Sequence, residues 1–377
     1  MKIFIFTKDF PKKNFIGGAE IQAYLLAKYL TLKNHQIKYL VLKGKKGLAQ
    51  TEIEGFKLFS LSSQQESDLK AIINFYQINK KEKPDLFFIR DFRYLFIFYL
   101  TCRFLKIPVI YNTTHINNCL PYPKKIKFSI NILATLISAK AALIHFLNFK
   151  TLKKVHVITI NRLHAEILKT KYNITATPIY NSMEDNYQKF KVAEKEDIIV
   201  WVANLKGRKR PEIFLQLAQE LKETNFKFLM IGYLQNNIDL YKKLIEETQN
   251  FNPNFKYLGG QAVEKVDEIL AKAKIFVNTC LPEGFGNNFI QAWLNECPTI
   301  TLDFDPDDII KNNKIGFHSA SYEQLAKDTK FLITNENTRA EMGKHAREFA
   351  LKNHLPKNNV LKYENYFLSI INKKQHD

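Results

Sequence analysis

A carboxylate and two glycines stand together in residues 275–300, IFVNTCLPEGFGNNFIQAWLNECPTI. The segment reads as a short apolar strand, a loop and a helix that we predict over 287–295. Gly286 lies where that helix begins, and the first backbone N–H groups of a helix attract phosphate. Glu283, just ahead of it, accepts hydrogen bonds from hydroxyls. Together they suit a sugar nucleotide. The alternative is an ordinary strand–helix turn, because short glycine motifs often match by chance.

A run of cations follows another predicted strand, residues 198–203. Arg208, Lys209 and Arg210 are consecutive, and Pro211 suits the first turn of the helix that we predict next. Three cations at the end of a strand neutralise a bound diphosphate and stabilise the charge on a departing one. The alternative is a basic loop that only faces solvent.

Weaker signals come from two glycines and one histidine in the first half of the chain. Gly17 and Gly18 follow the strand predicted at 2–7 and open an amphipathic helix, which lets a ligand approach the backbone. The pair lacks the spacing of a dinucleotide fingerprint. His115 comes just after a strand predicted at 108–111, and a lone histidine is more often structural than catalytic.

Predicted strands and helices alternate along most of the chain, which indicates parallel sheets with helices on both faces. Periodicity lapses and charges cluster around 187–197, so we predict a linker there. The predicted domains are then 1–190 and 196–355, followed by a helix over 356–377. Such domains bind ligands at the carboxyl ends of their strands. The predicted strands are 2–7, 36–42, 85–89, 108–111, 155–159, 177–180, 198–203, 226–231, 255–258, 274–278 and 299–302.

The charge of this 377-residue chain is unevenly placed. Residues 1–195 hold 32 Lys and Arg against 13 Asp and Glu, whereas residues 196–377 hold 24 of each. The excess implies an anionic partner for the first half: a membrane surface, a lipid phosphate, an anionic glycan or a nucleic acid. A lysine-rich bias that only aids solubility is the alternative.

Composition excludes several classes of protein. Hydrophobic residues make up 46% of the chain and charged residues 25%, as in ordinary globular proteins. No apolar run is long enough for a signal peptide or a membrane span. The four Cys lack metal-ligand spacing, so we expect a cytoplasmic protein with reduced thiols and no metal site.

An apolar segment within 124–154 has lysines on both sides, which is the pattern of an interfacial helix. A buried core helix is the alternative. Aromatic residues also mix with cations around Arg90, Arg93 and Arg103, and such a mixture can stack the bases of single-stranded nucleic acid. We expect the first half to dock on an anionic membrane surface. The cations assigned to this contact are Lys124, Lys125, Lys127, Lys150, Lys153 and Lys154.

The segment Glu-Gly-Phe-Gly at 283–286, with a polar residue eight positions after the glutamate, resembles the signature of family 4 retaining glycosyltransferases. The family's pattern is Glu, seven residues, Glu, and here Gln291 replaces the second carboxylate. The resemblance implies a GT-B fold. In that fold two Rossmann-like parallel-sheet domains face an interdomain cleft, and a helical C-terminal tail crosses back onto the first domain.

The resemblance also assigns roles at the diphosphate. Lys209 matches the family's diphosphate-binding Lys. Asn204 stands where the family has an Arg, so Arg208 would supply the missing charge.

The remaining assignments concern the sugar and the ribose. Glu283 would hold the donor sugar, Gln291 would read the ribose, and His115 would bound the sugar pocket near the reacting centre. Replacing Gln291 by Glu, the family residue, should then be tolerated. The catalytic assignments are therefore His115, Glu283 and Lys209. The donor-binding assignments beyond Lys209 are Gly17, Gly18, Asn204, Arg208, Gly232, Gly284, Phe285, Gly286, Asn287 and Gln291.

The implied activity is transfer of a sugar from a UDP- or GDP-sugar to an acceptor hydroxyl with retention of configuration, without a metal or other cofactor. With the acceptor on the basic first domain, we expect a role in polysaccharide or glycolipid assembly at the bacterial surface. The enzyme would be cytoplasmic and peripheral on the inner face of the membrane. Two alternatives stay open: a GT-B sugar-nucleotide epimerase, and a nucleic-acid-binding protein that uses the basic half.

Overall fold

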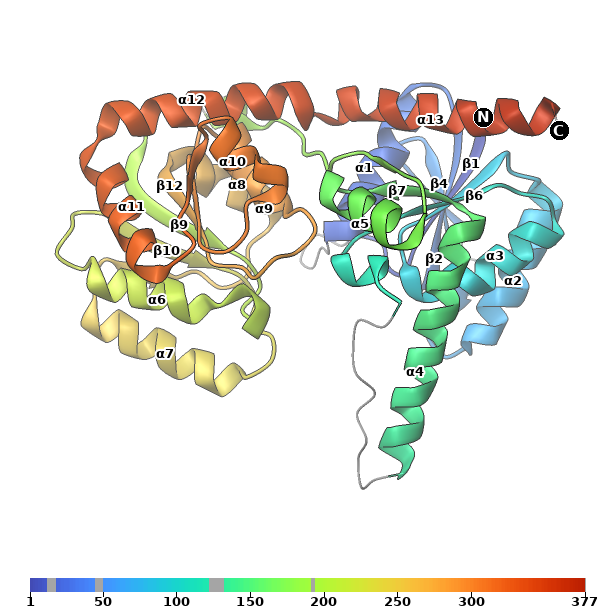
Figure 1. Cartoon of the computed structure of the whole chain (residues 1–377), viewed down its shortest axis with the longest axis horizontal. Helices are drawn as coiled ribbons and strands as arrows, with labels where there is room; N and C mark the ends of the chain where they lie inside the picture. Colours follow the sequence, from blue (N-terminus) through green and yellow to red (C-terminus); the bar gives the residue numbers. More distant parts are fainter. Residues whose placement is uncertain (12–17, 45–49, 122–131, 191–193, 377) are drawn as a thin grey trace. The chain divides into compact units, whose positions relative to one another are not determined.

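The computed structural model describes residues 1–11, 18–44, 50–121, 132–190 and 194–376, and its contacts divide the chain into two compact units. The first unit takes the residues up to Asn181 together with those from Pro356 onward, and the second runs from Ser182 to Leu355. The division falls ahead of the stretch 187–197, which we interpreted as a linker. Each unit is a parallel-sheet α/β structure, as predicted (Figure 1).

The described part of the first unit contains an eight-stranded sheet in which neighbouring strands are parallel except for β3 and β4. Alternate residues of its central strand serve two cores: Ile3 and Ile5 on one face, Phe4 and Phe6 on the other. A strand buried on both faces reads as a continuous apolar run, which explains the sequence KIFIFT. In sheet order the strands are β3 (Gln50–Ile53), β4 (Phe56–Ser63), β2 (Gln36–Gly44), β1 (Lys2–Thr7), β5 (Leu86–Ile89), β6 (Val109–Asn112), β7 (His156–Thr159) and β8 (Ala176–Pro178).

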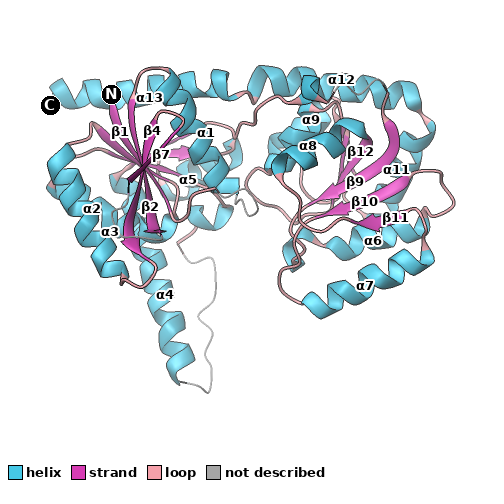
Figure 2. Cartoon of the chain, turned by 180° about the vertical axis from the view of Figure 1, so that it is seen from behind, coloured by secondary structure: helices cyan, strands magenta, loops and turns pink. Residues whose placement is uncertain are grey.

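Helices cover both faces of this sheet, and α13, which follows the second unit in sequence, is one of them (Figure 2). Val360 and Phe367 of α13 share a core with Ala23 and Leu26 of α1, and Asn112 Nδ2 donates to Tyr363 Oη at 2.8 Å. The helices on this face are α1 (Gly18–Leu32) and α13 (Pro356–His376). Those on the other face are α2 (Asp68–Glu82), α3 (Leu95–Phe104), α4 (Ile132–Thr151) and α5 (Arg162–Tyr172).

The described part of the second unit contains a six-stranded parallel sheet. From β9 the chain builds β10 and β11 outward on one side, and it then returns to build β12, β13 and β14 on the other. The order of the strands therefore reverses between β9 and β12. In sheet order the strands are β11 (Phe255–Tyr257), β10 (Lys227–Ile231), β9 (Glu196–Val202), β12 (Ala273–Asn278), β13 (Thr299–Thr301) and β14 (Gly316–His318).

The helices of the second unit also form two layers. One layer packs on the core around Trp201 and Phe228 and contains α6 (Pro211–Glu220), α7 (Ile238–Phe251) and α11 (Tyr322–Thr334). The other packs around Phe276, Phe289 and Trp293 and contains α8 (Val263–Lys272), α9 (Asn287–Leu294) and α12 (Glu336–Asn353). A short helix, α10 (Ile309–Asn312), precedes β14.

Candidate active site

Two loops of the second unit meet at the reversal point of its sheet. The first follows β9 and runs through residues 204–210, and the second follows β12 and runs through residues 279–286. Both start at the carboxyl ends of adjacent strands. Ligands of open α/β sheets bind at such a reversal point, outside the carboxyl ends of the strands. The two motifs with the clearest chemistry in the sequence therefore lie at one edge of one sheet.

The side chains of Lys209 and Glu283, 74 positions apart in sequence, form an ion pair at this edge. The Lys209 Nζ lies 2.6 Å from each carboxylate oxygen of Glu283. The two side chains are only 15% and 16% exposed, so the pair is largely removed from water. Burial alone would lower the pKa of Lys209, but the adjacent Glu283 carboxylate outweighs it and the pKa is raised. The site thus holds one fixed cation and one fixed anion in contact.

Hydrogen bonds lock the two loops to each other. The Thr279 hydroxyl donates to the carbonyl oxygens of Lys209 and Arg210, at 2.7 and 2.9 Å, and accepts from Trp201 Nε1 at 2.9 Å. Arg210 Nε in turn donates to the Thr279 carbonyl at 2.8 Å, and the Arg210 guanidinium pairs with Asp303. Arg210 therefore serves the scaffold, because two of its partners are parts of neighbouring loops.

Arg208, which we predicted to bind diphosphate, also links these two loops. Its backbone carbonyl accepts from the Leu281 N–H at 2.9 Å, and its exposed guanidinium donates to the Pro282 carbonyl. Asn204, at the position of the family's Arg, uses its Oδ1 to accept from the Tyr233 N–H at 3.2 Å. Asn204 thus fastens the loop after β10, and Arg208 and Lys209 are the cations beside Glu283.

Glycines are required where backbones and side chains approach closely. A Cβ at Gly286 would lie 3.3 Å from Glu283 Oε1 and 2.3 Å from Asn288 Oδ1, so the carboxylate passes directly over Gly286 at the start of α9. Gly232 has φ +153°, and a Cβ there would lie 1.7 Å from the Ala203 carbonyl oxygen. Gly232 is therefore needed for packing of the strand ends, whatever else it contacts.

Three other donor-binding assignments lie along the same loop. Gly284 is buried, and Asn287 is half-buried as the first residue of α9. The Phe285 side chain is 5% exposed and packs against His354 and Trp293, with ring centroids 5.1 and 6.0 Å apart. Its ring anchors the loop in the core, so any contact of Phe285 with a ligand falls to its backbone.

Gln291 is 8% exposed and has an unexpected partner. Its Nε2 donates to Asp267 Oδ1 at 2.8 Å, and Asn186 Nδ2 donates to Asp267 Oδ2 at 3.0 Å. Burial raises the pKa of Asp267 to about 6, although both hydrogen bonds act to lower it. The expectation that Gln291→Glu is tolerated does not fit this geometry, because the new carboxylate would face Asp267. Sequence reasoning missed Asp267, whose signal is an acid among the apolar core positions Val266 and Ile269 of α8.

In the first unit, His115 follows the carboxyl end of β6 and is half-buried. Its Nδ1 accepts from the Asn117 N–H at 3.0 Å, which leaves the ring proton of the neutral imidazole on Nε2. The Asn118 Oδ1 accepts from the backbone N–H groups of Thr114 and His115. The ring is therefore held in the tautomer that carries its proton on Nε2. Gly18 begins α1, and Gly17 lies outside the described residues.

The basic surface of the first unit differs in part from the prediction. Lys150, Lys153 and Lys154 are exposed at the end of α4 and in the turn after it, whereas Lys124, Lys125 and Lys127 lie outside the described residues. Arg90, one of the cations that we grouped with nearby aromatic residues, is buried at 4% exposure, with its Nη2 3.4 Å from Asn181 Oδ1. It is a core residue and not a surface cation.

Helix α4 projects away from the sheet of its unit (Figure 1). Leu143 and Ile144 on this helix are 58% and 40% exposed, and Lys140 is exposed beside them. The buried-core alternative holds for the end of the segment, where Phe149 and Leu152 are buried, and not for Leu143 and Ile144. Within the residues that the structure describes, no helix is both long and apolar enough to cross a bilayer.

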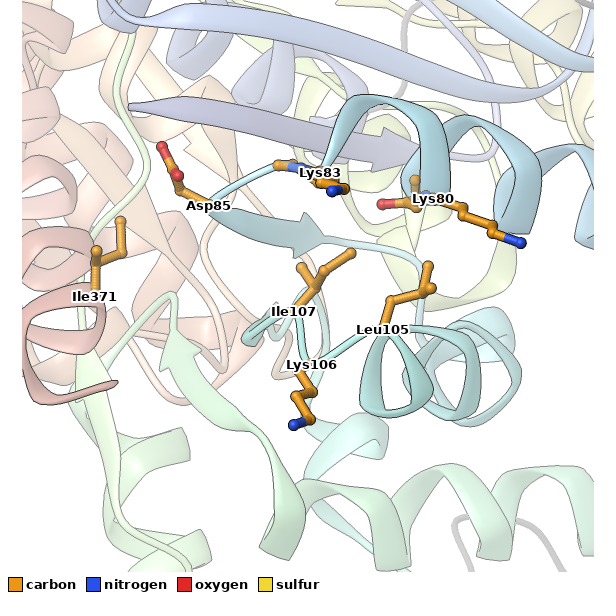
Figure 3. A pocket seen from close by; sticks show the side chains of 9 residues that line it. Lys80, Lys83, Asp85, Leu105, Lys106, Ile107 and Ile371 are labelled. Carbon is orange, nitrogen blue, oxygen red and sulfur yellow. The ribbon is translucent and has the colours of Figure 1, made fainter. Parts of the chain in front are cut away.

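A pocket of about 450 Å³ lies at the opposite edge of the first unit's sheet, before β5 and β6 (Figure 3). Lys80, Lys83 and Lys106 line it, together with Asp85. The C-termini of α2 and α3 end there, and the lysines complement their negative dipole ends. This pocket is not at the strand ends that bind ligands in such folds. Over the described residues, no group of three or more His, Cys, Asp or Glu side chains is arranged to hold a metal ion.

Two family models together match most of the chain. Residues 16–183 match the model described as Glycosyltransferase Family 4, and residues 182–349 match the model described as Glycosyl transferases group 1. A search of curated protein sequences returns no match.

Solved structures share the fold along the whole chain. Sucrose-phosphate synthase from Thermosynechococcus elongatus superposes with a TM-score of 0.76 at 13% identity, covering 99% of both chains. Anabaena HepE, solved in complex with UDP and glucose, gives 0.69 at 14% identity over 98% of this chain and 100% of its own. A glycosyltransferase from Rickettsia africae gives 0.71 at 15% identity, covering 98% of both chains. At these identities the likeness establishes the GT-B fold.

Proposed function

Because the chain belongs to the family 4-like glycosyltransferases of group 1, we propose that it transfers a sugar from a nucleotide-sugar to an acceptor hydroxyl with retention of configuration. The proposed donor is a UDP- or GDP-sugar. The complexes of Anabaena HepE with UDP and UDP-glucose support a nucleotide-sugar for a protein of this fold. The observation that carries the proposal is the ion pair of Lys209 and Glu283 at the reversal point of the second sheet.

The two members of the ion pair bind different parts of the donor. Lys209, with Arg208 beside it, binds the diphosphate and stabilises its charge as it leaves. Glu283 accepts hydrogen bonds from sugar hydroxyls, and the backbone at Gly284 and Gly286 approaches the sugar closely. A donor that enters exchanges the internal ion pair for two new contacts: phosphate to ammonium and hydroxyl to carboxylate. After the exchange the ammonium is paired with a phosphate and the carboxylate accepts hydrogen bonds, so neither group is left without a partner in a poorly hydrated site.

His115 is assigned to the sugar end of the donor. The N–H on its Nε2 is a hydrogen-bond donor for a sugar oxygen, and the fixed Nδ1 contact keeps that tautomer. His115 is not proposed as a base, since its Nδ1 is already an acceptor within the chain. Gly17 and Gly18 are assigned to the donor phosphates or the acceptor, and Gln291 to the ribose.

For the acceptor we propose a glycan or lipid-linked molecule bound by the first unit, in surface polysaccharide or glycolipid assembly. The charge excess of residues 1–195 supports an anionic surface as partner. The exposed apolar pair Leu143 and Ile144, with Lys140 and Lys150 on the same helix, suits the interface of an anionic bilayer. The enzyme would then work as a cytoplasmic protein, peripheral on the inner face of the membrane.

A thermal-shift screen against UDP-, GDP-, ADP- and CMP-sugars tests the donor. We expect the sugar nucleotides of one base to raise the melting temperature of the wild type and of Lys206→Ala, a control in the same loop. They should not raise the melting temperature of Lys209→Ala. Product analysis by NMR then tests retention, because the anomeric configuration of donor and product must agree. Conversion of the donor without an acceptor would favour the epimerase. Binding of single-stranded nucleic acid with no response to any nucleotide-sugar would favour the nucleic-acid-binding alternative.

A further inference from the structure

Gln291 occupies the position of the second carboxylate of the resembled signature, yet a carboxylate lies next to it. Asp267, on the neighbouring helix α8, accepts from Gln291 Nε2 at 2.8 Å and is itself 3% exposed. The second carboxylate is thus absent from position 291 on α9 and present one helix away. Asp267 does not replace it directly, because its own side chain is buried behind Gln291.

The contact with Asp267 decides which way the Gln291 amide faces. An amide has a donor end and an acceptor end, whereas an ionised carboxylate only accepts. The NH₂ end of Gln291 must therefore face Asp267, and its carbonyl oxygen must face away. Asn186 is oriented in the same manner, since its Nδ2 donates to Asp267 at 3.0 Å and its Oδ1 accepts from Lys189 Nζ at 2.7 Å. Hydrogen-bond chemistry fixes both amides.

Gln291 lies one turn along the helix that begins at the candidate site. Side chains on a helix lean toward its N-terminus, and residues four apart share a face. Gln291 lies four residues after Asn287, the first residue of α9, whose N-cap is Gly286. The Gln291 side chain therefore leans toward the first turn of α9, where Glu283 Oε1 lies near Gly286.

We propose that Asp267 is a positioning residue that holds Gln291 so that its Oε1 accepts a hydrogen bond from a ribose hydroxyl of the donor. An oriented amide and a buried acid then perform what a carboxylate on α9 performs in the resembled signature. The inference rests on the proposed function, because it assumes a nucleotide at this edge of the sheet. It gives Asp267 a role in reading the nucleotide that no sequence motif indicates.

A double-mutant cycle of Gln291→Glu and Asp267→Asn tests the contact between Gln291 and Asp267 without any ligand. Gln291→Glu alone places two carboxylates in contact, which must share a proton. Its melting temperature should fall at pH 8 and recover toward pH 5. In the double variant the new amide at position 267 donates to the new carboxylate at position 291 and accepts from Asn186, so the loss at pH 8 should disappear. Equal losses in the single and double variants would overturn the pairing.

Ribose reading is tested by calorimetry with UDP and GDP and with their 2′- and 3′-deoxy analogues. Loss of one hydrogen bond corresponds to roughly a 3- to 10-fold change in affinity. We expect the wild type to bind UDP or GDP, whichever it recognises, more tightly than the deoxy analogue of the same nucleotide by such a factor. The ratio should approach one in Asp267→Leu and persist in the double variant. Asn186→Ala is the matched control: it removes a similar bond to the same carboxylate without touching Gln291, so its ratio should match the wild type.

The outcomes separate this inference from the proposed function. A wild type that binds UDP or GDP but does not distinguish the deoxy analogues overturns the inference and leaves the function standing. An affinity ratio in Asp267→Leu equal to that of the wild type also overturns the inference. If Asp267→Leu fails to fold, a ratio of one in the double variant overturns it instead. A wild type that binds neither nucleotide overturns the proposed function, and the ribose role of Gln291 with it.

Discussion

Opposite substitutions in the ion pair should change nucleotide affinity in opposite directions. A diphosphate that binds Lys209 competes with Glu283, whose two oxygens lie 2.6 Å from the Lys209 Nζ. Glu283→Gln removes the competing charge and keeps the shape of the side chain. Lys209→Met removes the cation and leaves the carboxylate facing the phosphates. We therefore expect UDP or GDP to bind Glu283→Gln at least as tightly as the wild type and Lys209→Met much more weakly.

The magnitude follows from the contact itself. A hydrogen bond to a charged group contributes about 1.5–3 kcal/mol, which is roughly a 10- to 100-fold change in affinity. Lys209→Met should lose at least the lower figure. Glu283→Gln should gain up to the same figure for the nucleoside diphosphate, while it loses most transfer activity because the sugar contact is gone. It also leaves Lys209 without its partner at 15% exposure, so we expect about 3 kcal/mol less stability without nucleotide.

Calorimetry with the nucleoside diphosphate at low salt measures the two affinities, and Lys206→Met controls for loss of a cation from the same loop. Melting temperatures with and without nucleotide report the stability. Saturating nucleoside diphosphate should raise the melting temperature of Glu283→Gln more than that of the wild type. Equal weakening by Glu283→Gln and Lys209→Met would refute the exchange, since it would mean that both residues hold the phosphates together. Near-wild-type turnover by folded Glu283→Gln would remove Glu283 from the site.

Three further predictions follow from single contacts. Gly286→Ala places a Cβ 3.3 Å from Glu283 Oε1 and 2.3 Å from Asn288 Oδ1, so the start of α9 must shift, and we expect turnover to fall at least tenfold and the melting temperature to fall as well; unchanged turnover would contradict the placement. Because the folded pKa of Asp267 is raised to about 6, its contribution to stability is full below pH 4 and falls by about 3 kcal/mol as pH rises through 6; denaturant titrations should show this in the wild type and not in Asp267→Leu. Leu143→Asp should weaken co-sedimentation with anionic vesicles, whereas Phe251→Asp, at a 52% exposed site in the second unit, should not; equal effects would argue against docking through α4.

Strands buried on both faces were predictable because their apolar runs depend only on local sequence. Predicted and observed bounds agree for β1 and differ by one or two residues for strands such as β9. The strands β3 and β4 were missed; they form an antiparallel hairpin, in which β3 is the edge strand and β4 alternates apolar residues with Lys and Ser. Their turn, Glu54–Gly55, has φ of +45° and +81°, as a tight two-residue hairpin requires, and Gly55 is the turn signal that the sequence offered.

The candidate site was predictable as loops but not as contacts. The positions of Lys209 and Glu283 after parallel strands placed them at one edge of a sheet. Their pairing could not be predicted, because it depends on how far each loop reaches. Phe285 shows the converse: it lies inside the clearest motif, yet its ring serves the core. Asp267 lies in no motif, and only the packing of α8 against α9 brings it to Gln291.

The place of α13 in the first unit has a consequence for synthesis on the ribosome. Val360, Tyr363, Phe367 and Ile370 complete a core whose other members come from the first 179 residues. They emerge only after the second unit, Ser182–Leu355, has been translated. At about 5–20 residues per second that delay is roughly 10–35 s. During this time α1 alone covers this face of the nascent first sheet, and the part that α13 covers is exposed. The first unit therefore begins to emerge first and finishes folding last. A holding chaperone should bind chains stalled near residue 350 and release them once α13 is available.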